Sequence, residues 1–157
     1  MNIGDKVPQY LGVDEAGKEW HAADMAGRYW VLYFYPKDNT SGCTAEACSL
    51  QEAVPRFEQL NIPIIGVSKD SAASHKKFKA AHNLAFPLLV DAETRLQQEM
   101  GVWVPKSMYG KTYMGTLRST FIVDPQGTII HKMQGKEIKT AQHAAQLLQW
   151  LRENNIQ

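Results

Sequence analysis

The chain has 157 residues, a length typical of one domain, and 44% of them are hydrophobic and 21% charged, which argues against intrinsic disorder. Lysine and arginine number 17 against 16 aspartate and glutamate residues. The resulting net charge of +1 argues against a nucleic-acid or anionic-membrane binder, so we expect one domain over residues 1–157 that binds neither.

The beginning of the chain and its cysteines indicate a compartment. Residues 1–10 mix charged residues and proline with scattered apolar ones and lack the apolar core of a signal peptide. The longest apolar run, 30–35, is far shorter than the ~20 residues of a membrane-spanning helix. Two cysteines are too few for a disulfide scaffold. We therefore expect a cytoplasmic protein whose thiols are free to react.

The first elements predicted along the chain are a hairpin, a strand, a helix and a second strand. The turn sequence at 15–18 indicates the hairpin. Residues 30–35 are β-branched and aromatic on both faces, which predicts a buried central strand. A helix is predicted over about 42–60, with a kink or break caused by Pro55. The run 62–67 predicts the next buried strand.

The middle of the chain predicts two helices with a strand between them. A helix over 71–82 follows Asp70, which we interpret as its cap. Residues 85–90 predict a short strand that is interrupted by proline, as at a strand start or a sheet edge. A further helix over 92–100 ends at a glycine.

The remainder predicts a loop, a second hairpin and a last helix. The aromatic-rich segment 103–113 is interpreted as a loop that lines the substrate mouth, docks a reductant or simply packs. Residues 119–123 and 128–132 flank a good turn sequence and predict an antiparallel hairpin. Apolar residues at helical spacing predict a helix over 140–153. The alternation of strands and helices predicts an α/β layered domain, whose active site lies where strands end and helices begin.

Cys43 lies at such a junction, between the strand 30–35 and the helix that follows it. Unpaired backbone amides and the positive end of a helix dipole stabilise a thiolate there, and the thiolate is the nucleophilic form. The alternative is that Cys43 and Cys48 are small buried hydrophobic residues, as free cysteines often are. The polar residues around the junction favour a reactive Cys43.

The spacing of the two cysteines carries further information. Residues five apart in an ideal α-helix are separated by about 7.5 Å of rise and about 140° of rotation, so their Cα atoms lie roughly 8–9 Å apart. A disulfide needs less than about 7 Å. If both cysteines lie on one helix, they pair only after that helix unwinds.

The residues around Cys43 resemble the active-site motif of the peroxiredoxins. The string Tyr-Phe-Tyr-Pro-Lys-Asp-Asn-Thr-x-Gly-Cys-Thr over 33–44, with a second cysteine five residues on, is similar to the bacterioferritin-comigratory or Q-type branch. Ser41 stands where that branch commonly has proline. The resemblance continues at 111–115 and 118–124 and covers essentially the whole chain in order.

The resemblance implies a thioredoxin-like fold: a central mixed β-sheet flanked by helices, with an amino-terminal hairpin extension. It also implies an atypical 2-Cys peroxidase that reduces hydrogen peroxide and organic hydroperoxides and protects the cell from oxidative stress. Cys43 would attack the peroxide and become a sulfenic acid. Cys48 would resolve this acid as an intramolecular disulfide, which thioredoxin or a similar dithiol would reduce. We expect a monomer, because the resolving cysteine lies in the same chain.

Three further residues acquire roles from the resemblance. Thr40 would donate its hydroxyl to sulfur or peroxide, although a helix cap is an equally ordinary role for threonine. Arg118 would reach the thiolate and hold the peroxide, although most arginines are surface ion-pair partners. Pro36 would shield the thiolate from water, or merely end the strand. Glu46 would either orient Arg118 or complete a helix-start pattern, and its spacing favours the helix start.

No cofactor is expected. The five histidines are scattered without a metal-ligand signature around the cysteines, and no glycine-rich phosphate loop precedes a helix. Two other functions are compatible with a reactive cysteine. A cysteine hydrolase would leave Cys48, Thr40 and Arg118 without roles. A peroxide-sensing redox switch that alters a partner surface remains an alternative.

Overall fold

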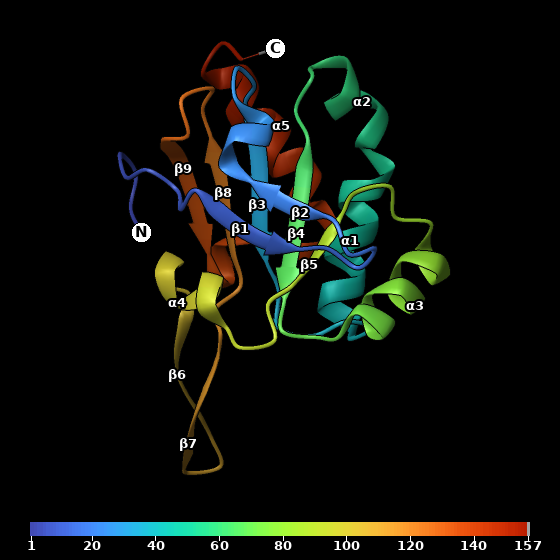
Figure 1. Cartoon of the computed structure of the whole chain (residues 1–157), viewed down its shortest axis with the longest axis vertical. Coiled ribbons are helices and arrows are strands. Elements are labelled where there is room, and N and C mark those ends of the chain that lie inside the picture. Colours follow the sequence, from blue (N-terminus) through green and yellow to red (C-terminus); the bar gives the residue numbers. More distant parts are fainter. Residues whose placement is uncertain (157) are drawn as a thin grey trace.

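The computed structural model describes residues 1–156 and is built on a five-stranded sheet in the order β5-β4-β3-β8-β9. The three parallel strands at one side are β3 (Trp30–Phe34), β4 (Ile64–Ser68) and β5 (Leu88–Val90). The antiparallel strands β8 (Ser119–Val123) and β9 (Ile129–Gln134) complete it, and β8 pairs with β3. The expected α/β fold with a central mixed sheet is confirmed (Figure 1).

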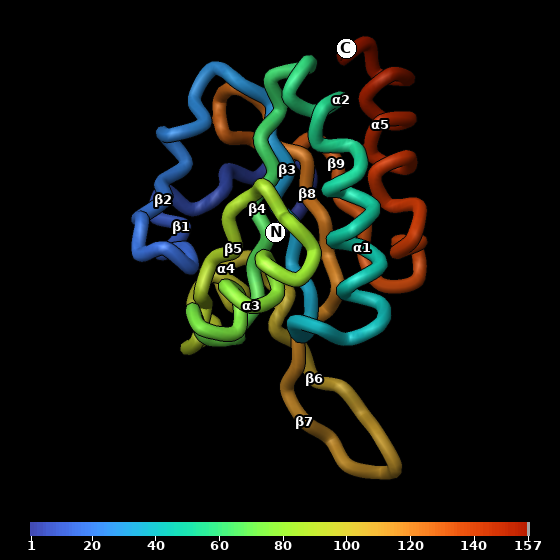
Figure 2. The backbone as a smooth tube through the Cα atoms, turned by 90° about the vertical axis from the view of Figure 1, so that its right-hand side faces the viewer, coloured from blue at the N-terminus to red at the C-terminus, as the bar shows by residue number. Residues whose placement is uncertain are grey.

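Both faces of the central strand β3 are buried, as its sequence predicts. Val31 and Tyr33 share one core cluster with α1 (Ser41–Glu52), α2 (Val54–Gln59), α3 (Ala72–His82) and α5 (His143–Glu153). Leu32 and Phe34 point to a second cluster under α4 (Arg95–Met100) and the amino-terminal hairpin of β1 (Tyr10–Val13) and β2 (Glu19–His21). Helices α1 and α5 lie side by side on the first face (Figure 2). The sheet is therefore covered on both sides.

The predicted helix over 42–60 is two helices. α1 ends at Glu52 and α2 begins at Val54, with Pro55 in the first turn of α2, so the expected break is confirmed. The cap predicted for α3 was wrong. Ser71 caps this helix, because its Oγ accepts a hydrogen bond from the Ser74 amide at 3.1 Å. Asp70 serves a different contact, described below.

The aromatic-rich segment is a hairpin rather than the predicted loop. β6 (Trp103–Met108) pairs antiparallel with β7 (Lys111–Thr116) and turns at Tyr109 and Gly110, both with positive φ. The hairpin extends away from the sheet (Figure 2). Tyr109 is 98% exposed at its tip, which excludes the packing interpretation for that side chain.

The helices of the described residues are all too short or too polar to cross a membrane.

Candidate active site

Cys43 lies in the first turn of α1, directly after the carboxyl end of β3. The side chain is buried, and its Sγ accepts a hydrogen bond from Nη2 of Arg118 at 3.3 Å. Arg118 immediately precedes β8, which pairs with β3. The pairing of β8 with β3 thus brings to the sulfur a cation that lies 75 residues away in sequence. A cation in hydrogen-bonding contact with a cysteine sulfur stabilises the thiolate.

Glu46 holds this arginine in place. It lies three residues after Cys43 on α1, is fully buried, and its Oε1 accepts from Nη1 of Arg118 at 2.5 Å. The helix-start interpretation of Glu46 was therefore wrong, because no cap contact is formed and the carboxylate turns inward. Burial raises the pKa of Glu46 to about 7, against the opposing effect of the Arg118 guanidinium. Burial acts to lower the pKa of Arg118, but Glu46 and Cys43 outweigh it and raise that pKa, so the guanidinium stays charged.

Gly42 makes the approach of Arg118 possible. A Cβ atom on this residue would lie 3.3 Å from Nη2 of Arg118 and 4.0 Å from Cγ2 of Thr140. The first contact is tighter than most that a Cβ makes, so a side chain here would force the guanidinium to shift. Glycine at position 42 thus leaves space for the Arg118 guanidinium beside Cys43.

His143 lies behind Glu46 as a neutral, hydrogen-bonded ring. Its Nδ1 lies 3.0 Å from Oε1 of Gln146, and its Nε2 lies 2.7 Å from Oγ1 of Thr120. Since Gln146 Oε1 is an acceptor, Nδ1 carries the proton and Nε2 accepts from the Thr120 hydroxyl. Burial lowers the pKa of His143 to about 4, in agreement with a neutral ring. His143 therefore offers no proton to Oε2 of Glu46, which lies 3.7 Å away without a hydrogen bond.

The two remaining residues of the expected motif, Thr40 and Pro36, lie close to Cys43 in the chain but form no hydrogen bond to its sulfur. Thr40 occupies the N-cap position of α1, yet its hydroxyl is exposed and donates to the carbonyl oxygen of Lys37 at 2.9 Å. Its side chain thus forms neither the cap nor a hydrogen bond to Cys43. Pro36 is half-buried at the exit of β3.

A buried polar network that sequence reasoning missed anchors the loop between β3 and α1. Asp38 accepts hydrogen bonds from Tyr35 at 2.5 Å and Ser74 at 2.8 Å, and lies 2.7 Å from Nδ1 of His75. The Asp38 amide donates to Asp70 at 2.8 Å. The hydrogen bonds from His75 and Tyr35 lower the pKa of Asp38 despite its burial, so it is an anion in this loop.

Three of these groups, Asp38, Asp70 and His75, have ligand atoms within 4.8 Å of one another, the kind of group that could hold a metal ion. Each is already engaged by hydrogen bonds within the protein, including one from Ser68 to Asp70 at 2.7 Å. These hydrogen bonds accordingly hold the loop that precedes α1 in place.

Cys48 lies on the same unbroken helix as Cys43, five residues further on, and both are free thiols. Because the two cysteines share one helix, their Cα atoms are too far apart for a disulfide between the two side chains. The two cysteines can therefore pair only after the helix unwinds, as the sequence spacing predicts. Cys48 is half-buried, and its Sγ lies 3.7 Å from Nδ1 of His82 at the end of α3.

Lys106 on β6 is a second cation near the site, and sequence reasoning missed it. Burial and the Arg118 guanidinium lower the pKa of Lys106, while Cys43 opposes the shift. Its stem lies over Gly115, where a Cβ would come within 2.9 Å of Lys106 Cδ.

Comparisons with known proteins agree with this geometry. The model of the AhpC/TSA family matches residues 3–132. Peroxiredoxin Bcp of Bacillus subtilis is 44% identical over 153 residues, which are 98% of this chain and 96% of that protein. The chain belongs to the AhpC/TSA family as a peroxiredoxin. Peroxiredoxin Bcp of Escherichia coli is 33% identical over 154 residues, which are 98% of this chain and 97% of that protein.

Solved structures support the same assignment. A peroxiredoxin Q mutant of Xylella fastidiosa superposes on this peroxiredoxin with a TM-score of 0.89 at 34% identity, covering 99% of this chain and 98% of that one. The bacterioferritin comigratory protein of Xanthomonas campestris gives 0.85 at 34% identity, covering 96% and 99%. The expected family, thioredoxin-like fold and thiol peroxidase activity are confirmed, and the redox-switch alternative is not favoured.

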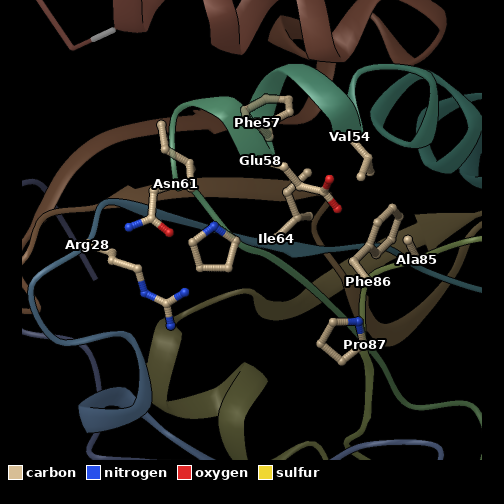
Figure 3. Close-up of a pocket in the computed structure, with 11 residues that line it drawn as sticks. Arg28, Val54, Phe57, Glu58, Asn61, Ile64, Ala85, Phe86 and Pro87 are labelled. Carbon is tan, nitrogen blue, oxygen red and sulfur yellow. The ribbon is translucent and has the colours of Figure 1, made fainter.

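The peroxiredoxin also carries a cavity away from the cysteines. It has a volume of about 260 Å³ and lies between α2 and the amino ends of β4 and β5, where Phe57, Ile64 and Phe86 line it (Figure 3). Cys43 follows the carboxyl end of β3, which is parallel to both strands. The cavity therefore lies at the amino ends of the parallel strands, whereas the thiol lies at their carboxyl ends.

Proposed function

We propose that Cys43 is the peroxidatic cysteine and that Cys48 resolves it. The observation that carries the proposal is the hydrogen bond from Arg118 to Cys43 Sγ, with Glu46 fixing the other nitrogen of the same guanidinium. A planar, permanently charged fork can hold the sulfur and an incoming oxygen together. The buried position of Cys43 limits the approach to a small substrate.

In the first step the Cys43 thiolate attacks one peroxide oxygen. A sulfur–oxygen bond forms while the oxygen–oxygen bond breaks, and the departing oxygen takes a proton and leaves as water or alcohol. Negative charge develops on the oxygens, so Arg118 stabilises the transition state. Thr40 would turn its hydroxyl from Lys37 to the peroxide, and Pro36 would keep bulk water from the sulfur.

In the second step Cys48 sulfur attacks the sulfenic acid of Cys43. The disulfide forms, the sulfur–oxygen bond breaks and water leaves. A dithiol reductant then returns both thiols, and we propose thioredoxin for this role. Because both cysteines lie on one helix, no second subunit is needed and we propose a monomer. The need to return both thiols in each cycle favours the reducing cytoplasm.

The substrates we propose are hydrogen peroxide and organic hydroperoxides. The solved Xanthomonas campestris relative is described by its alkyl peroxide reduction activity, which supports the second class.

Peroxide-dependent turnover with a thioredoxin system tests the assignment. Cys43→Ser abolishes turnover, since serine supplies no thiolate at neutral pH. Cys48→Ser still undergoes the first oxidation, stops at a sulfenic acid that dimedone traps, and loses recycling by thioredoxin. Wild-type turnover in the Cys43 variant would overturn the first role, and an unchanged thioredoxin-coupled rate in the Cys48 variant would overturn the second.

A further inference from the structure

Among the described residues, His82 is the one side chain in hydrogen-bonding contact with Cys48, with 3.7 Å between its Nδ1 and the sulfur. His82 is the last residue of α3. Its ring packs against the Phe78 ring in a T-shaped arrangement, with centroids 5.3 Å apart. Phe78 is itself buried, so the ring contacts a fixed neighbour as well as the thiol. The contact joins α3 to α1 across 34 residues.

We propose that His82 is the general base that prepares Cys48 for attack on the oxidised Cys43. This inference rests on the proposed role of Cys48 as the resolving thiol. It assigns His82 as a further catalytic residue, because its nitrogen contacts the reacting sulfur.

Nδ1 of His82 takes the proton of the Cys48 thiol, which leaves a thiolate and an imidazolium. The thiolate attacks the Cys43 sulfenic acid, the sulfur–sulfur bond forms and hydroxide leaves with the electron pair of the sulfur–oxygen bond. The imidazolium returns its proton through water to the hydroxide. The net products are a disulfide and one water molecule.

An imidazole suits this task because it takes and releases protons near neutral pH. A free cysteine thiol is only a few per cent ionised at pH 7, so complete deprotonation accelerates its attack by at most about thirtyfold. The proton has to move before α1 opens, because the contact with His82 is made on the intact helix.

The test compares His82→Gln, which keeps a side chain of similar reach without a titrating base, with His21→Gln at an exposed histidine of β2. Cys48 is measured alone in the Cys43→Ser background by its rate of alkylation with iodoacetamide at pH 7. We expect His82→Gln to slow alkylation roughly three- to thirtyfold and His21→Gln to leave it unchanged.

Stopped-flow oxidation of the chain with both cysteines separates the steps. His82→Gln should leave sulfenic acid formation at the wild-type rate and slow disulfide closure by the same factor as alkylation. Added imidazole should restore closure in His82→Ala. Unchanged closure, faster closure or no rescue by imidazole would overturn the role of His82.

The Cys48→Ser variant keeps the two proposals distinguishable. A persistent sulfenic acid in that variant upholds Cys48 as the resolving thiol whatever the His82 variants show. Continued thioredoxin recycling in that variant would instead overturn the role of Cys48.

Discussion

Oxidation of the two cysteines should unwind the first part of α1. Cys43 and Cys48 lie on one continuous helix, which places their Cα atoms roughly 8–9 Å apart. A disulfide holds Cα atoms at about 5.5–6 Å and does not form beyond about 7 Å. The helix would have to shorten this separation by about 3 Å, which its hydrogen bonds do not permit, so the turns containing the two cysteines have to open.

The structure sets the extent of the opening. Leu50 is fully buried in the core cluster and α1 already ends at Glu52, so α2 need not melt. Amides at about 44–50 should exchange with solvent at least about a hundredfold faster in the oxidised protein. Each tenfold corresponds to about 1.4 kcal/mol of opening free energy, and a buried helix resists opening by several kcal/mol.

Hydrogen exchange on the reduced and the fully disulfide-bonded protein measures this directly. The amides of α2 serve as an internal control, and Cys48→Ser treated with the same peroxide serves as a control for oxidation without a disulfide. Unchanged protection over 44–50 in a fully disulfide-bonded sample would refute the reasoning.

Three substitutions test the surroundings of Cys43. Arg118→Lys keeps the charge but loses the fork that contacts Cys43 and Glu46 together, so the second-order rate with peroxide, measured by stopped flow, should fall at least about tenfold. Gly42→Ala should lower that rate several-fold without loss of stability in urea, because the new methyl group displaces Arg118 while alanine favours the helix. Equal rates in either variant would contradict the geometry. Glu46→Gln should flatten the dependence of stability on pH. The folded pKa of about 7 exceeds the ordinary 4.5, so the stabilisation is complete below about 4.5 and is lost as the pH rises through 7. Between pH 5 and 8 the free energy of unfolding of the wild type should fall by about 2–3 kcal/mol relative to the variant, and parallel pH profiles would contradict the assignment.

The local part of the site could be predicted from the sequence. The apolar run 30–35 followed by polar residues and Cys43 places the thiol between a strand and a helix, and the structure agrees. Pro55 likewise predicts the end of α1, since its ring is tolerated in a first helical turn but not in a helix interior.

The long-range part could not be predicted from spacing alone. Arg118 reaches Cys43 only because β8 pairs with β3, and Glu46 is directed inward by that contact. His75, His82 and His143 are far apart in sequence, and their roles follow from the packing of α3 and α5 around α1.

The β6–β7 hairpin was not predicted from the sequence, for a different reason. Its strands bury no continuous face, so the alternation of apolar and polar residues that marks a strand is weak. Pro105 is also unfavourable within a strand, and the turn uses Tyr109 before glycine rather than asparagine or aspartate. Lys106 was missed together with the hairpin that presents it.

The most direct test of the central claim is the mass of one peptide. Trypsin cuts after Lys37 and Arg56, and no lysine or arginine lies between them, so both cysteines fall on peptide 38–56. The protein is treated with one equivalent of hydrogen peroxide, alkylated under denaturing conditions and digested. We predict a peptide lighter by two hydrogen atoms that carries no alkyl group, and reduction should restore two alkylation sites. A peptide alkylated at both Cys43 and Cys48, after the peroxide has been consumed, would contradict the account.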